Sequence, residues 1–161
     1  MRHKYSDREL RSIIMKSLER EAPRRLPFTA DADGFRDLWW VHRSVPPGPQ
    51  DFDWFTFEMG GEEVARAEVN FRSRVHRDYV VPSVPTQIVE ITFIEVRNDL
   101  VGRGIGPAVV EQIIAHYPDP VFAASPVEAI GYWRELGWLE CERIERQPVG
   151  NSLFILDTRN F

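Results

Sequence analysis

The sequence contains few of the residues that hold a protein together, or to a membrane, by means other than a hydrophobic core. Its 161 residues include one cysteine, Cys141, which excludes an internal disulfide and a cysteine-based zinc site. The four histidines show no pair at the spacing of metal ligands, so we expect no metal. The charged N-terminus is not followed by an apolar run, and no later stretch is apolar enough to cross a membrane. We therefore expect a cytoplasmic protein that makes no contact with membranes.

Positive charge is also scarce. The chain has 20 Lys and Arg residues against 25 Asp and Glu residues, and its formal net charge is -5. Because nucleic-acid binding needs a basic surface that neutralises phosphates, we expect no nucleic-acid partner. Hydrophobic residues, by contrast, make up 43% of the chain, which is enough for a core, and the length fits a single domain spanning residues 1–161.

Two helices are predicted in the N-terminal part, residues 1–50. Ser6 and Glu9 have the spacing of a capping box, and apolar residues follow at helical spacing as far as Leu18. A second helix start is predicted at residues 31–34, followed by an apolar side that includes Trp39. The Pro-Pro-Gly-Pro run at residues 46–49 ends this helix.

Strands alternate with helices in residues 51–161. A hairpin is predicted from two strands, 54–59 and 64–71, because two glycines form a turn signal between them. The further elements are predicted in this order: an apolar central strand at 88–96, a helix at 104–116, a strand at 121–124, a helix at 127–136 with Gly137 as its C-cap, and strands at 138–144 and 153–157. This order indicates an α/β (α+β) fold with a single mixed sheet of six to seven strands and helices on both faces.

The most informative segment is Val101-Gly102-Arg103-Gly104-Ile105-Gly106, between the central strand and the helix that follows it. Alternating glycines allow a tight turn that gathers backbone N–H groups at a helix N-terminus, where the helix dipole favours phosphate oxygens. A tight turn without a ligand is the alternative. Pro107 and Ala108 fit neither a dinucleotide-binding fingerprint nor a Walker loop, because those motifs require other residues at these positions.

The segment from Glu95 to Gly106 resembles the pyrophosphate-binding motif of the GNAT superfamily, the GCN5-related N-acetyltransferases, which reads Gln/Arg-x-x-Gly-x-Gly/Ala. Residues 129–138, Ala-Ile-Gly-Tyr-Trp-Arg-Glu-Leu-Gly-Trp, are similar to the second signature of that family, often Ala-x-x-Phe-Tyr-Glu-Lys-Leu-Gly-Phe. The two motifs stand in the family's order and spacing. The resemblance covers residues 54–157, and it implies a mostly antiparallel sheet with a splayed central strand pair.

Two positions depart from the family pattern. Val101 stands where Gln or Arg is usual, which keeps the backbone N–H and removes the side chain. Trp133 stands where many members have a Tyr that reprotonates the leaving thiolate. The neighbouring Tyr132 is the predicted general acid, with a position in the core as its alternative, because one residue along a helix turns a side chain by about 100°.

The resemblance implies acetyl-coenzyme A (acetyl-CoA) as the acetyl donor. In the family, backbone N–H groups of the glycine loop hold the pyrophosphate, and here they belong to Gly102, Arg103, Gly104, Ile105 and Gly106. The Arg103 side chain adds charge to this site or lies in solvent. Unpaired backbone groups of Ile94 and Val96 on the splayed strand are expected to bind the pantetheine arm, and Ser125 is expected to bind the pantetheine or the thiol.

Direct attack by an amine requires a base, because an ammonium ion has no lone pair. Glu90 is the first candidate, since its place relative to Val101 matches the glutamate used by the histone-acetylating branch of the family. Glu95 is the second, and on a regular strand it faces the other way unless a bulge intervenes. For Glu90 an ordinary exposed or paired charge is the alternative.

The family builds its acceptor site mainly from the first two helices, so Trp39 and Trp40 are predicted substrate contacts. The acceptor is expected to be the amine of a small molecule or peptide, and the negative net charge favours a cationic one such as a polyamine, an aminoglycoside or a basic peptide. A non-catalytic acyl-CoA-binding or sensory module of the same fold is the alternative function. A homodimer is left open.

Overall fold

The computed structural model describes residues 3–22, 25–30, 32–43, 51–74, 78–81, 88–118, 121–125, 129–144 and 152–156, with the backbone alone for 121–125. The elements follow one another as α1 (Asp7–Leu10), β1 (Ile14–Leu18), α2 (Asp37–Trp40), β2 (Phe52–Met59), β3 (Glu62–Ser73), β4 (Ile88–Val96), a 3-10 turn (Asn98–Leu100), α3 (Ile105–His116), β5 (Val121–Ser125), α4 (Ile130–Glu135), β6 (Leu139–Cys141) and β7 (Ser152–Leu156). Among these described residues, no helix has the length and apolar character needed to cross a membrane.

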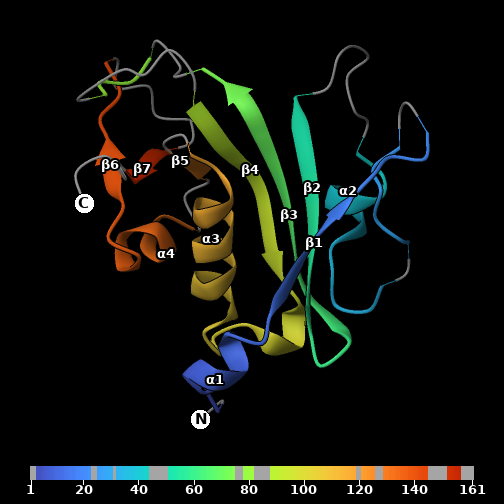
Figure 1. The fold of residues 1–161 in the computed structure, drawn as a ribbon. Coiled ribbons are helices and arrows are strands. Elements are labelled where there is room, and N and C mark those ends of the chain that lie inside the picture. Colours follow the sequence, from blue (N-terminus) through green and yellow to red (C-terminus); the bar gives the residue numbers. More distant parts are fainter. Residues whose placement is uncertain are drawn as a thin grey trace.

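Seven strands form one sheet in the order β1-β2-β3-β4-β5-β7-β6. Strands β4 and β5 run parallel, and each of the other neighbouring pairs is antiparallel. The predicted mixed, mostly antiparallel sheet is therefore confirmed. Figure 1 shows α3 and α4 on one side of β4, and α2 on the other.

Each face of the sheet has its own apolar cluster. Beneath α3, residues such as Phe57 from β2 and Val109 from α3 form the larger cluster, and both have no exposed surface. Beneath α2, Trp40 packs with Phe28 and Trp54 in a smaller cluster on the opposite face. Side chains of a strand alternate between the two faces, so β2 and β4 contribute to both clusters.

The predicted first helix is wrong beyond its first turn. The capping box is present, because the backbone N–H of Ser6 donates to Glu9 Oε2 at 2.8 Å, but α1 ends at Leu10 and the chain then forms β1. Residues 14–18 pair with Trp54–Glu58 along the edge of β2. A short helix has a weak intrinsic stability, and pairing with an existing sheet edge satisfies the same backbone groups and buries Ile13.

The elements around the glycine loop match their predictions closely. The hairpin, the central strand at 88–96 and the helix that ends at His116 are confirmed. The second predicted N-terminal helix is a single turn, and α4 is shorter than predicted. Gly137 adopts φ +78°, and the N–H groups of Gly137 and Trp138 donate to the carbonyls of Arg134 and Trp133, which is the Schellman pattern of a helix end.

Candidate functional site

Strands β4 and β5 pair over three residues and then separate. The paired positions are Val89 with Val121, Glu90 with Phe122, and Ile91 with Ala123. Beyond Ile91, β4 continues to Val96 in contact with β3, whereas β5 continues to Ser125 in contact with β7. The edge of β4 that faces β5 is thus unpaired around Ile94 and Val96 within the described chain. This agrees with the splayed strand pair that the resemblance implies.

A cleft of about 840 Å³ lies where the two strands separate. One side, which we call the loop wall, consists of Val101, Gly102 and Gly106. The other side, the α2 wall, consists of Arg36, Trp39 and Glu95. The remaining described lining residues are Ile94, Val96 and Asn98 from β4 and the turn after it, and Ala129, Tyr132 and Trp133 from the α4 region.

The glycine loop has the backbone that its sequence predicts. Gly102 and Gly104 adopt φ +82° and φ +95°, a left-handed conformation that residues with a Cβ rarely take. Gly104 is the N-cap of α3 and has no side chain to bond the first turn. The N-terminal N–H groups of a helix have no partner within the helix, so this end favours an anion. A Cβ added at Gly102 would meet no atom within 4 Å, so this part of the loop is open.

The Arg103 side chain lies against the N-terminal segment. Its guanidinium carbon is 5.8 Å from the centre of the Tyr5 ring, and the Arg103 carbonyl accepts a hydrogen bond of 3.1 Å from the Tyr5 N–H. Figure 1 shows the N-terminal helix α1 beside the start of α3. Arg103 is not among the described residues that line the cleft. Its contacts with Tyr5 therefore fix the loop on the side away from the cleft.

The two neighbouring aromatic residues of α4 have different surroundings. Trp133 is buried in the core, where its ring lies 4.7 Å from that of Trp138. The Tyr132 hydroxyl is buried at the cleft without a hydrogen-bond partner in the described chain, and burial raises the pKa of its phenol. A Cβ added at Gly106 would lie 3.0 Å from this hydroxyl, so Tyr132 reaches the first turn of α3.

A bulge in β4 decides which side chains face α2. The register moves between Glu68 and Val69 of β3, so that Thr92 of β4 has no partner opposite it. Ile91 and Ile94 consequently both pack in the larger cluster under α3, whereas Phe93 packs under α2. Glu90 precedes this bulge and Glu95 follows it, and both therefore lie on the α2 face. A regular strand would have placed them on opposite faces.

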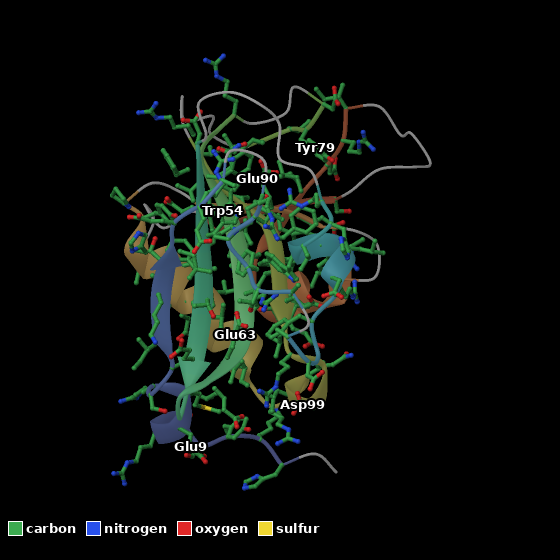
Figure 2. All side chains as sticks on the ribbon, turned by 90° about the vertical axis from the view of Figure 1, so that its right-hand side faces the viewer. Glu9, Trp54, Glu63, Tyr79, Glu90 and Asp99 are labelled. Atoms are coloured by element: carbon green, nitrogen blue, oxygen red, sulfur yellow. The ribbon has the colours of Figure 1, made fainter. Side chains whose placement is uncertain are left out.

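Glu90 lies in the part of β4 that still pairs with both neighbours. Its carboxylate accepts a hydrogen bond of 2.6 Å from the Ser73 hydroxyl. Figure 2 shows Glu90 toward the upper end of the sheet and Asp99, which follows β4, near the lower end. Glu90 is not among the described residues lining the cleft. Its role as a base remains a prediction.

Glu95 lines the cleft and is closely held by the α2 region. Its Oε2 accepts from the indole N–H of Trp40 at 2.6 Å and from the backbone N–H of Arg36 at 3.1 Å. Its Oε1 lies 3.4 Å from Nε of Arg36. These contacts occupy both oxygens of Glu95 and attach the start of α2 to β4.

The two predicted substrate contacts of α2 differ. Trp39 is half-buried and lines the cleft, with its ring 5.5 Å from that of Phe93. Trp40 has no exposed surface, and its prediction as a substrate contact is corrected: the indole packs 4.6 Å from Phe28 and donates to Glu95. Successive residues of a helix point in different directions, so only one of the pair can reach the cleft.

Two predictions concern groups that the described residues do not show. Ser125 ends β5 opposite Ser152, but its side chain lies outside the described part of the structure. In the described ranges, no three His, Cys, Asp or Glu residues lie close enough together to hold a metal ion.

Sequence reasoning missed Arg36, Asn98 and Ala129 as lining residues. Asn98 and Ala129 lie within the two motif segments, residues 95–106 and 129–138, so the sequence could have indicated them. Arg36 had no such signal, because it reaches the cleft through contacts with Glu95, 59 positions away along the chain.

Comparison with solved structures reveals the fold to which this cleft belongs. The chain is similar to the Bacillus subtilis N-acetyltransferase YlbP solved in complex with coenzyme A, with 17% identity over 66% of this chain and 68% of that one and a TM-score of 0.51. The chain has the GNAT acetyltransferase fold. It is also similar to the KacTA protein in a KacTA–DNA complex, with 12% identity over 92% of this chain and 94% of that one and a TM-score of 0.60.

Comparison by sequence adds no relative to these. No family model matches the chain. No curated protein matches it either. The GNAT fold therefore rests on the arrangement of the elements, and the chemistry of the cleft has to be argued from its own residues.

Proposed function

We propose that the protein is an N-acetyltransferase that moves the acetyl group of acetyl-CoA to an amine by direct attack. One observation carries this proposal: the splay of β4 from β5 opens into the same cleft as the glycine loop at the start of α3. Anion-binding backbone therefore lies at one end of the cleft, and unpaired strand backbone lies along its side. A pantetheine diphosphate needs both of these features.

The donor is proposed to lie along the loop wall. Its diphosphate accepts hydrogen bonds from the N–H groups of residues 102–106, and the pantetheine pairs with the free edge of β4 at Ile94 and Val96. The loop wall suits this role because it offers backbone groups and carries no side chain larger than Val101. Ser125 is kept as a proposed contact of the pantetheine or the thiol.

Glu90 is the proposed base. Within the described chain Glu90 has one hydroxyl partner, whereas Glu95, which lines the cleft, is held by three contacts with the α2 region. The freer carboxylate supports the choice of Glu90. Glu90 removes a proton from the ammonium, directly or through water, and the neutral amine attacks the thioester carbonyl. The new C–N bond forms, the C–S bond breaks, and the sulfur leaves as a thiolate. The nitrogen loses its second proton to solvent water, which leaves a neutral amide, and Glu90 returns its proton to solvent.

Tyr132 is the proposed acid that protonates the thiolate. It has the one hydroxyl group among the described residues that line the cleft, and that hydroxyl has no hydrogen-bond partner. Burial raises its pKa, so the phenol is protonated at neutral pH but is a weaker acid than an exposed tyrosine. The proposal therefore rests on the position of the hydroxyl at the cleft.

The acceptor is proposed to be a small molecule or peptide that approaches over the α2 wall. Trp39 is the proposed contact there, because its ring lines the cleft. We propose no nucleic-acid partner, because the net charge of -5 does not favour binding to phosphates. The DNA in the KacTA–DNA complex is a ligand of that protein.

Thiol release from acetyl-CoA, measured over a panel of amines with mass spectrometry of the product, tests the proposal. We expect release with at least one amine, and an N-acetylated product. Tight binding of coenzyme A without release on any amine supports the non-catalytic acyl-CoA module instead. A ligand at 100 times its Kd stabilises a protein by about 2.7 kcal/mol. Absence of any thermal stabilisation by acetyl-CoA would contradict both functions.

A further inference from the structure

The α2 wall carries an open positive charge. Two of the described residues that line the cleft are charged, Arg36 and Glu95. The Glu95 carboxylate is satisfied by the three contacts given above. The Arg36 side chain is 65% exposed, and its shortest contact with Glu95 is through Nε, at 3.4 Å. Neither of its terminal nitrogens donates a hydrogen bond within the described chain. A ligand in this cleft therefore meets a positive group, although the chain as a whole is acidic.

The guanidinium of Arg36 is held in a fixed plane. Its central carbon lies 4.3 Å from the centre of the Trp39 ring, and Nε lies 3.4 Å from Glu95 Oε1. Trp39 is in turn in edge contact with Phe93, at 5.5 Å between ring centres. An arginine fixed on one face and at Nε leaves the edge that carries its two terminal nitrogens for a partner from outside the chain.

The α2 wall is tied to the sheet at further points. The Asn98 N–H donates to the Gly34 carbonyl at 2.9 Å, which fixes the segment before α2 to the end of β4. After α2, Arg43 pairs with the buried Glu68 and lies 4.2 Å from the Phe93 ring. Glu68 also accepts from the Trp54 indole at 2.8 Å. The wall is thus preorganised, which reduces the entropy lost when a ligand binds.

We propose that Arg36, stacked on Trp39, binds a carboxylate of the acceptor, so that the acceptor is an amine that also carries a carboxylate, such as an amino acid. This inference rests on the proposed function. Two terminal guanidinium nitrogens match the two oxygens of a carboxylate, and such charge-assisted pairs are among the stronger hydrogen bonds in proteins. The inference replaces the cationic acceptor that the net charge favoured, because a ligand responds to the local charge of the cleft.

The kinetic test compares amino acids with their amides as acceptors. In the wild-type protein we expect Arg36 to lower KM for the carboxylate form, and Arg36→Gln to reduce the acid-to-amide ratio of kcat/KM by about tenfold or more. The change in this ratio between variants is the readout, since amidation also alters the basicity of the amine. Arg36→Lys keeps the charge without the fork and should retain part of the preference.

Arg134→Gln is the matched control. Arg134 is 61% exposed and, like Arg36, pairs with one glutamate, Glu140, but it does not line the cleft. We expect this variant to keep the wild-type ratio. An equal loss of the ratio in both variants, or no loss in Arg36→Gln, overturns the proposal.

A coenzyme phosphate is the other source of an anion with the same chemistry. Calorimetry with coenzyme A and with dephospho-coenzyme A distinguishes the two sources. We expect Kd values within about twofold of wild type for Arg36→Gln, because the proposed anion belongs to the acceptor. If Arg36→Gln weakens coenzyme binding and keeps the acid-to-amide ratio, the anion is a phosphate and the proposal is overturned.

A binding measurement separates this inference from the proposed function. N-acetylglycine and N-acetylglycinamide are titrated into the protein saturated with coenzyme A, and the indole N–H resonance of Trp39 is followed. We expect the carboxylate to shift it, and no shift with the amide or in Arg36→Gln, while an unmoved indole resonance of the buried Trp138, which does not contact Arg36 or Glu95, shows that the variant is folded. A shift without thiol release on any amine would overturn the enzyme and keep the carboxylate site. No shift with either titrant would overturn the carboxylate site.

Discussion

The two walls of the cleft are built by different means. The loop wall offers backbone N–H groups from a short continuous segment, residues 101–106, and its shape follows from glycines at positive φ. The α2 wall offers side chains, Arg36, Trp39 and Glu95, which come from two segments and hold each other in place. A wall made of backbone suits a constant ligand such as the diphosphate of a coenzyme. A wall made of side chains can differ between proteins of one fold, which is consistent with the proposal that the acceptor binds there.

This comparison predicts that variants of the two walls affect different steps. The largest effect is expected from Glu90→Gln on the α2 face. Loss of the base should lower kcat by about 100-fold or more, because general base catalysis typically contributes that factor. The Kd for coenzyme A should stay unchanged. Glu95→Gln serves as the comparison, and an unaltered kcat in Glu90→Gln would remove Glu90 from the mechanism.

The second-largest effect is expected on coenzyme A binding, from a variant of the loop wall. Gly102→Val should weaken coenzyme A binding by about 30-fold or more, because a side chain would stand where the diphosphate is proposed to lie. Gly61→Val is the matched control: Gly61 has φ +84°, close to φ +82° at Gly102, and a Cβ at either position meets no atom within 4 Å. Both variants should lose a similar free energy of unfolding, about 1–2 kcal/mol for the left-handed backbone. Equal coenzyme affinity in the two would contradict the loop wall as the donor site.

A smaller effect on kcat is expected from a variant of Tyr132, which lines the cleft from α4. Tyr132→Phe should lower kcat about tenfold and leave Kd for coenzyme A nearly unchanged if the hydroxyl protonates the thiolate. Because burial raises the pKa of Tyr132, the wild-type phenol should stay protonated beyond pH 10, where an exposed tyrosine ionises. The contribution of the hydroxyl should therefore persist at high pH. A change in the Kd for coenzyme A with constant kcat would show that Tyr132 binds the donor and is not the acid.

The smallest effect is expected from Glu95→Gln. The amide oxygen can still accept from the Trp40 indole and the Arg36 N–H, as Oε2 does, but an amide NH2 would face Arg36 Nε in place of Oε1. The α2 wall should therefore loosen, and the protein should lose about 1–2 kcal/mol of unfolding free energy. KM for the acceptor should rise a few-fold, at constant Kd for coenzyme A. Glu58→Gln is the control, because the partly exposed pair of Glu58 with Lys16 contributes less than about 1 kcal/mol. A similar loss of stability in both variants would show that Glu95 is an ordinary surface partner.

The sequence predicts a region well when the contacts that shape the region join residues close together along the chain. The hairpin, β4, the glycine loop and α3 depend on local patterns: a two-glycine turn, an apolar run and an amphipathic helix. Residues 11–18 were predicted as helix because their local pattern is helical, but pairing with β2 outweighs that weak preference. The same competition with tertiary contacts leaves α2 as a single turn held by Glu95 and Glu68.

The sequence by itself determined the side of the cleft where we propose the donor to bind: a mixed sheet and a glycine loop at the start of α3. It could do so because a turn at positive φ and a helix N-terminus are set by neighbouring residues. Only the tertiary structure decided the side that is proposed for the acceptor. The bulge at Thr92 brings Glu90 and Glu95 to one face, burial withdraws Trp40 from the cleft, and contact with Glu95 brings Arg36 to it. Each of these depends on side chains that meet across the sheet, and no local pattern specifies such a contact.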